Sequence, residues 1–104
     1  MRGEVYRLRA PREASGHEQR GARYAVVVQS DLLPLSTWLV APTSTAARPA
    51  SFRPEIDVEG TPTLVLAEQT TAVDPQRLGP CVGRLSLHEV AELDAALRTV
   101  LDLR

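Results

Sequence analysis

The chain contains a single cysteine, no lysine and few aromatic residues. Cys81 alone excludes an internal disulfide framework and a four-cysteine metal site, and His17 and His88 add no recognisable zinc pattern. Aromatic residues are only 4% of the 104 residues, so a core must consist mainly of Val, Leu and Ala. No stretch approaches the roughly 18 apolar residues of a membrane span, and no apolar signal-peptide core follows Met1. A cytoplasmic protein without a metal or other cofactor is expected.

The composition is that of a globular protein, with 43% apolar and 24% charged residues, and the length fits one domain over residues 1–104. Charge is distributed unevenly along it. Residues 1–54 carry eight arginines against four acids, whereas residues 55–104 carry four arginines against nine acids. This polarity suggests one basic face, the minimum for holding a nucleic acid. All of the Lys and Arg positions are arginine, which suits phosphate contacts. Because genome composition also explains such a bias toward arginine, the bias does not decide the function.

Short apolar segments between turn residues predict a mainly β structure. Strands are expected over residues 3–9 and 23–30, and a third over residues 35–41 that ends at Pro42, since proline cannot donate to a ladder. Further strands are expected over residues 55–58, 63–67 and 81–85, and residues 69–73 could continue the strand of residues 63–67 after a kink. Polar loops are expected over residues 10–22 and 43–54.

The C-terminal segment has the pattern of an amphipathic helix. Ser86 and Glu89 have the spacing of a capping box, and Leu85 and Val90 are placed to form a hydrophobic staple. Apolar residues recur at three- and four-residue steps, at Val90, Leu93, Leu97, Val100 and Leu101. Many short strands before one helix predict a mainly β (α+β) domain, with a small, strongly curved antiparallel sheet or partial barrel under a C-terminal helix.

The segment from Gly16 to Ser30 carries the clearest chemical signal. A polar, glycine-bounded loop that contains Glu18 ends on Arg23, at the mouth of a hydrophobic strand. A carboxylate and a guanidinium five positions apart could face one ligand, and the strand would hold the arginine rigidly. Long loops in small domains are often functional. The alternative is a loop salt bridge, which contributes about 0–1 kcal/mol when exposed.

Four segments in chain order resemble the MazF/PemK toxin endoribonucleases. Arg2–Tyr6 is similar to the opening strand of that family, and Gly16–Gln19 with Arg23 is similar to its central signature. Val40–Thr45 resembles the strand end that supplies a threonine, and Glu68–Gln69 resembles a later acid-glutamine pair. The resemblance covers essentially the whole chain as one toxin domain.

The resemblance implies an SH3-like small barrel of the CcdB/MazF type with a C-terminal helix, assembled as a homodimer. It implies sequence-specific, metal-independent cleavage of single-stranded RNA, leaving 2′,3′-cyclic phosphate and 5′-hydroxyl ends, and inhibition by the C-terminal tail of a cognate antitoxin. Two departures stand out. Tyr24 replaces the usual proline, which could shift Arg23 or supply a ring for base stacking. Thr71 replaces a frequent lysine or arginine and so removes a phosphate contact.

Three residues are assigned to the chemistry of 2′-hydroxyl attack. Glu18 is the candidate base, although its ordinary pKa of about 4.3 is low, so burial must raise it or it only positions other groups. Arg23 is the candidate phosphate clamp, and the resemblance also implies a role as acid. Thr43 is expected to donate a hydrogen bond to a non-bridging phosphate oxygen, with turn capping as the alternative.

Seven further residues are candidates for RNA contacts, each with a structural alternative such as keeping a loop soluble or buttressing it. They are His17, Gln19, Arg20, Ser44, Arg48, Arg53 and Gln69. Trp38 is expected in the core or a dimer interface, and Cys81 as a small buried side chain.

Two other functions compete with RNA cleavage. A gyrase poison of the CcdB type shares the implied fold, but it depends on a Trp-Gly-Ile tail, whereas this chain ends Leu-Asp-Leu-Arg. The other alternative is a non-catalytic barrel that only binds nucleic acid or protein. Homodimerisation fits each of these, because a small barrel with exposed edges gains from a two-fold contact.

Overall fold

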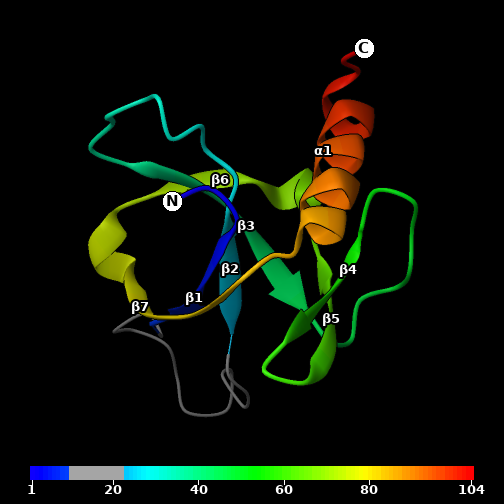
Figure 1. Cartoon of the computed structure of the whole chain (residues 1–104), viewed down its shortest axis with the longest axis horizontal. Coiled ribbons are helices and arrows are strands. Elements are labelled where there is room, and N and C mark those ends of the chain that lie inside the picture. Colours follow the sequence, from blue (N-terminus) through cyan, green and yellow to red (C-terminus); the bar gives the residue numbers. More distant parts are fainter. Residues whose placement is uncertain (10–22) are drawn as a thin grey trace.

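The computed structural model describes residues 1–9 and 23–104 (Figure 1). These residues form strands, two short 3₁₀-helices and a C-terminal α-helix. In chain order they are β1 (Glu4–Leu8), β2 (Tyr24–Val27), β3 (Trp38–Ser44), β4 (Glu55–Val58), β5 (Thr61–Val65), η1 (Ala67–Gln69), β6 (Thr71–Val73), η2 (Pro75–Arg77), β7 (Leu78–Arg84) and α1 (Leu87–Leu101).

The strands form one curled antiparallel sheet in the order β4-β5-β3-β2-β1-β7. β3 is the strand on which the sheet divides. Its first half pairs with β6, with Trp38 opposite Val73, and its second half pairs with β5, with Thr43 opposite Val65. β2 lies along the other side of β3, with Ala25 opposite Pro42. The expected strongly curved sheet with a C-terminal helix is confirmed.

The main core lies between one face of this sheet and α1. Alternate residues of the central strands, such as Val26 and Ala41, are fully buried there, as strand periodicity requires. Leu93 of α1 reaches into the same cluster and is fully buried, with Val90 and Leu97 packed beside it. The helix therefore covers this face, as its apolar spacing predicted (Figure 1).

The opposite face of the sheet carries a second and smaller cluster. Ala25, Val27 and Val40 are buried on it, and partly buried side chains that include Tyr6 and Trp38 pack around them. The rings of Tyr6 and Trp38 meet edge to face, with their centroids 5.7 Å apart. Trp38 thus lies at the margin of a core cluster.

The predicted helix start is confirmed in detail. The Ser86 hydroxyl accepts from the Glu89 N–H, and the Glu89 carboxylate accepts from the Ser86 N–H, which completes a capping box. The second Glu89 oxygen accepts from the backbone N–H of Asp57 at 2.8 Å. Glu89 therefore joins the helix start to β4, at the edge of the sheet, a connection that local spacing does not reveal.

The expected end of the third strand at Pro42 is wrong, because β3 continues to Ser44. Pro42 lies where β3 passes from β6 to β5, so the missing N–H disrupts neither ladder, and the Pro42 carbonyl accepts from the Leu66 N–H. The fifth strand begins earlier than expected, at Thr61, because Glu59 and Gly60 form a tight turn with φ of 51° and 87°.

The segment after β5 also departs from the prediction. The 3₁₀-helix η1 turns the chain, so β6 does not continue β5 but pairs with β3. β7 begins at Leu78 and passes through Pro80, which is tolerated because β7 is an edge strand. Cys81 of β7 is exposed, so its expected burial is wrong. No helix among the described residues is long and apolar enough to cross a membrane.

Candidate functional site

Some candidate site residues lie outside the described residues, and the others lie on or near the strands that the structure describes. His17, Glu18, Gln19 and Arg20 lie outside the described residues, so the predicted approach of Glu18 to Arg23 stays a prediction. Arg23 directly precedes β2 and is exposed. Its carbonyl accepts from the Leu8 N–H of β1 at 2.8 Å, which fixes the arginine backbone against the neighbouring strand.

Thr43 lies next to this point on the adjacent strand. It is buried, with 9% of its surface exposed, and its hydroxyl donates to the Tyr24 carbonyl at 3.1 Å. The β2–β3 register, with Ala25 opposite Pro42, brings Tyr24 and Thr43 side by side. The structure therefore gathers the backbone of Arg23 and the side chain of Thr43 at one end of the sheet, and the threonine hydroxyl is already engaged there.

Tyr24 and Arg7 belong to the same end of the sheet. Sequence reasoning considered Tyr24 only as a residue that could shift Arg23 or stack on a base, and it gave Arg7 no role in the site. They are opposite each other on β1 and β2. The Tyr24 hydroxyl donates to a Glu59 carboxylate oxygen at 3.2 Å, and its ring packs against the main core. Arg7 is exposed and contributes a further positive charge beside Arg23. Strand alternation in β1 turns Arg7 to the opposite face of the sheet from Tyr6. This alternation was the sequence signal that could have placed Arg7 near the site.

Burial raises the pKa of the Tyr24 phenol, and the hydrogen bond to the Glu59 carboxylate raises it further. The positive charge of Arg7 acts in the opposite direction but does not outweigh them. The phenol is therefore a hydrogen-bond donor at neutral pH, since its ordinary pKa of about 10 is already well above 7.

Arg53, a predicted RNA contact, is engaged by Glu68. Its Nη2 and Nε lie 2.6 Å and 3.0 Å from the same Glu68 oxygen, Oε2, and its Nη1 donates to the Arg48 carbonyl at 3.1 Å. The other Glu68 oxygen, Oε1, is buried without a hydrogen-bond partner among the described residues. The Arg53 guanidinium is the main cause that lowers the pKa of Glu68. Sequence reasoning noted Glu68 only in a motif and missed this contact.

The remaining candidates lie around this pair and at the end of β3. The Ser44 hydroxyl accepts a hydrogen bond from the Ala46 N–H, and Gln69 is exposed at the end of η1. Arg48 is exposed in the loop that Arg53 closes. The two groups of candidates are connected through β5: Val65 is opposite Thr43, and its N–H donates to the carbonyl of the residue that follows Arg53.

Comparison with known proteins decides the family. The sequence profile of the PemK-like, MazF-like toxins of type II toxin–antitoxin systems matches residues 1–101. The chain belongs to this family. A candidate toxin of Mycobacterium tuberculosis is 41% identical over 104 residues, which cover 99% of this chain and 98% of that relative.

Solved structures agree with the fold of a PemK/MazF-like toxin. A mycobacterial endoribonuclease in complex with its cognate antitoxin matches with a TM-score of 0.80 at 19% identity, covering 100% of this chain and 96% of that one. The M. tuberculosis toxin MazF-mt6 matches with a TM-score of 0.76 at 18% identity, over 97% and 98% of the two chains. MazF of Deinococcus radiodurans matches with a TM-score of 0.75 at 22% identity, over 98% and 96%.

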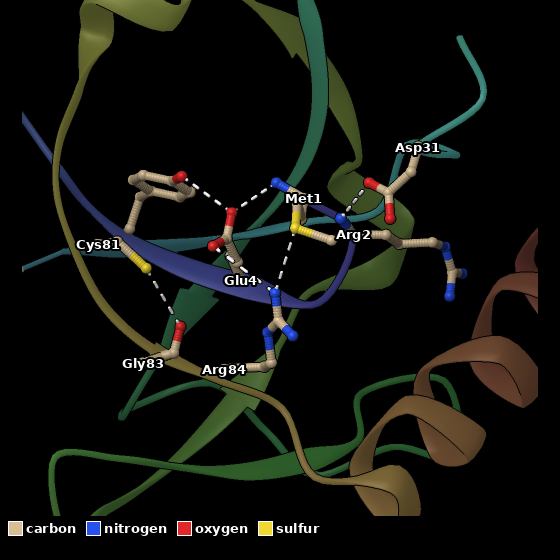
Figure 2. Close-up of polar contacts among 8 residues, drawn as sticks. Met1, Arg2, Glu4, Asp31, Cys81, Gly83 and Arg84 are labelled. Carbon is tan, nitrogen blue, oxygen red and sulfur yellow. Dashed lines mark hydrogen bonds and ion pairs between the residues drawn. The ribbon is translucent and has the colours of Figure 1, made fainter.

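The PemK/MazF-like chain has another polar cluster, centred on Glu4 (Figure 2). Glu4 Oε1 accepts from the Tyr6 hydroxyl at 3.0 Å and pairs with the Met1 amino group, and Glu4 Oε2 lies 3.8 Å from an Arg84 nitrogen. The Met1 contact is the main cause that lowers the pKa of Glu4, and burial followed by the Glu4 hydrogen bond raises the pKa of Tyr6 to about 12. These contacts join β1 to β7, so their evident role is structural.

Metal chemistry receives no support from the described part of the chain. Within residues 1–9 and 23–104, no group of three or more His, Cys, Asp or Glu side chains could hold a metal ion.

Proposed function

We propose that this toxin-family chain is an endoribonuclease that cleaves single-stranded RNA at a short sequence motif. The observation that supports it is the position of Arg23, an exposed cation whose backbone is fixed by β1, next to Thr43 at the same end of the sheet. The relatives of this fold that are described as endoribonucleases, and the family assignment, point in the same direction. Residues 1–104 then act as a single toxin domain in the cytoplasm.

In the proposed mechanism the RNA 2′-hydroxyl attacks the adjacent phosphorus and expels the 5′-oxygen, leaving a 2′,3′-cyclic phosphate. Arg23 stabilises the negative charge that builds up on the phosphate, an aimed electrostatic interaction that is often the largest catalytic contribution. Glu18 takes the proton of the 2′-hydroxyl, and the departing 5′-oxygen takes a proton from Arg23, which leaves a 5′-hydroxyl end. Proton exchange with water then restores both side chains. No metal ion or cofactor is required by these steps.

Thr43 has a specific requirement in this scheme. Its hydroxyl carries one proton, which is donated to the Tyr24 carbonyl in the free protein. For Thr43 to donate to a phosphate oxygen, the hydroxyl must rotate away from this carbonyl when RNA binds. The remaining contacts are assigned to His17, Gln19, Arg20, Ser44, Arg48 and Gln69, and to Arg53 if RNA displaces Glu68.

The partners follow from the same proposal. Two copies form a homodimer, and a cognate antitoxin covers the RNA-binding surface with an acidic tail that competes with RNA for the arginines. Structures of related MazE–MazF complexes from D. radiodurans support an antitoxin partner for the family. Simultaneous binding of RNA and antitoxin at full affinity would contradict this competition.

The test is cleavage of total RNA by the purified protein in the presence of a chelator, followed by mapping of the released 5′-hydroxyl ends. We expect ends at one short motif, and at least a hundredfold loss of cleavage in Arg23→Ala, the order of effect for a charge-stabilising group. Arg98→Ala, which removes an exposed arginine from α1, is the matched control and retains cleavage. Undiminished cleavage by a folded Arg23→Ala variant would refute the site.

A further inference from the structure

We propose that Tyr24 is a positioning residue of this site, which holds the β4–β5 turn across β3 through the hydrogen bond from its hydroxyl to Glu59. The inference rests on the proposed function, because it concerns the arrangement of the RNA-binding end of the sheet. Tyr24 does not take part in the chemical step. It fixes the groups around Thr43 in the arrangement that RNA binds.

The hydrogen bond between Tyr24 and Glu59 connects β2 to the turn between β4 and β5. In the sheet order, β3 lies between β2 and β5, so the 3.2 Å bond from Tyr24 to Glu59 joins two elements that are not neighbours. The hairpin turn of β4 and β5 reaches toward the start of β2 (Figure 1). Glu59 is held in the left-handed region at φ 51°, a conformation that is uncommon for a residue other than glycine.

Tyr24 is connected to Thr43 as well as to the β4–β5 turn. Thr43 is on β3, adjacent to Tyr24, and its hydroxyl donates to the Tyr24 carbonyl. Tyr24 thus contacts Thr43 through its backbone and the turn through its side chain. The Tyr24 ring is fixed in turn by packing against the main core. One residue therefore sets the position of the candidate catalytic threonine and of the turn that borders it.

The charges at this point argue for positioning. Arg7 is opposite Tyr24 on β1, and Arg23 directly precedes Tyr24 in the chain, so two cationic residues neighbour Tyr24 at this end of the sheet. The Tyr24 hydroxyl donates to the carboxylate of Glu59, which carries the opposite charge. If Glu59 were free to move, its negative charge could approach the arginines and compete with RNA phosphates for them. The hydroxyl of Tyr24 keeps the carboxylate at the turn.

Loss of the bond is expected to act on binding more than on the chemical step. A freed turn lowers the fraction of molecules whose site is ready for RNA, and the apparent affinity falls by the same fraction. Tyr24→Phe removes only the hydroxyl and keeps the ring and the carbonyl that accepts from Thr43. We therefore expect KM for RNA to rise about three- to tenfold with kcat within about twofold of the unmodified protein.

The experiment compares Tyr24→Phe, Glu59→Ala and the double variant, with Tyr6→Phe as control. Tyr6 also donates its hydroxyl to a carboxylate, that of Glu4, but in the structural cluster of β1 and β7. The two single variants should raise KM alike, and the double variant should be no worse than either, since both remove one bond. Glu59→Gln keeps an acceptor and should recover part of the loss, and Tyr6→Phe should leave KM unchanged.

A second measurement does not depend on cleavage. Amide hydrogen exchange at Gly60 and Thr61 should be faster in Tyr24→Phe than in Tyr6→Phe, because only the first frees the turn. Unchanged exchange, or unchanged KM in an enzyme that Arg23→Ala inactivates, would overturn the positioning role and leave the proposed function standing. Absence of RNA cleavage by the unmodified protein would overturn the proposed function, and then this inference, which rests on it, even if exchange at the turn responds.

Discussion

Among the ion pairs of the described residues, Arg53 and Glu68 form the least exposed one, with 23% and 26% of their side chains accessible. Three atoms of the guanidinium are used, two toward Glu68 and one toward the Arg48 carbonyl. The pair therefore closes the loop before β4 against η1. An RNA phosphate can reach Arg53 only by competing with a carboxylate that is already well placed.

We predict that Arg53→Ala destabilises the protein in a pH-dependent way. Arg53 holds the pKa of Glu68 below its unfolded value, so the stabilisation is present above the unfolded pKa and is lost as the pH falls through the lowered folded one. Urea unfolding at pH 7 should show a clear loss of stability relative to the unmodified protein, and the two proteins should converge at an acid pH at which Glu68 is protonated in both. Equal differences at both pH values would show that Arg53 acts through packing alone.

Residue identities in the site were predictable only where a local pattern or a family motif marked them. The motifs marked Arg23 and Thr43, and the structure puts them at one end of the sheet. The engaged hydroxyl of Thr43 and the carboxylate partner of Arg53 depend on β3, β5 and η1 meeting, which no local spacing encodes. Cys81 was expected inside because cysteine is usually buried, but it lies on an edge strand, where outward residues stay exposed.

At the scale of elements, the start of α1 has two functions. Ser86 and Glu89 cap the first turn, and Glu89 also accepts from the Asp57 N–H of β4. Burial favours the neutral form of the Glu89 carboxyl, but the N–H groups of Ser86 and Asp57 outweigh it, so the net effect lowers the pKa of Glu89. The carboxylate form is thus the one that joins the helix to the edge of the sheet.

We predict that Ser86→Ala lowers the free energy of unfolding by about 1 kcal/mol, the usual effect of losing an N-cap. Glu89→Gln should cost at least as much at pH 7, because it weakens the bonds to both Ser86 and Asp57. Since the Glu89 pKa is lowered by folding, its contribution is lost as the pH falls through the folded pKa. The difference between Glu89→Gln and the unmodified protein, measured by urea unfolding, should therefore shrink as the pH is lowered and the Glu89 carboxylate becomes protonated.

Glu92→Gln is the matched control for this experiment. Glu92 is one turn further along α1 and is exposed. Its Oε1 atom lies 3.6 Å from Nε2 of His88, which is also exposed. An exposed pair of this kind contributes little to stability. A loss in Glu92→Gln as large as in Glu89→Gln would mean that helix charge, and not the bond to β4, explains the effect.

The elements themselves were predictable to different degrees for a physical reason. The capping box and the apolar spacing of α1 lie within one segment, so the sequence alone marks the helix. The strand limits depend on pairing partners. Pro42 stays within β3 because it falls between two ladders, and Thr61 begins β5 because the Glu59–Gly60 turn is tight.

At the scale of the whole molecule, the two faces of the sheet differ in how well they are covered. Among the described residues, α1 closes the face of Val26, whereas side chains that are themselves partly exposed pack on the face of Val27. The segment between β2 and β3 adds an exposed apolar surface. Its members are Leu32, Leu33, Leu35 and, at the start of β3, Leu39, which are 89%, 50%, 49% and 39% exposed.

Apolar surface of this kind is often covered in an assembly, and a closed two-fold dimer is the commonest one. We therefore propose that two copies of the chain bring their β2–β3 segments into one interface, and we predict a dimer in sedimentation velocity at micromolar concentration. Leu32→Asp should weaken the dimer by at least about tenfold, because it places an unpaired charge in a desolvated contact. The side chain is so exposed in the single chain that the fold should not suffer.

Leu87→Asp is the matched control for Leu32→Asp. Leu87 is 91% exposed, as accessible as Leu32, but it is the first residue of α1, where a negative charge is favourable. If the dimer used any exposed leucine, both variants would dissociate; if it uses the β2–β3 segment, only Leu32→Asp does. A dimer that survives Leu32→Asp unchanged would place the interface on another surface, and the face around Trp38 would be the next to test, because the apolar side chains packed there are only partly buried.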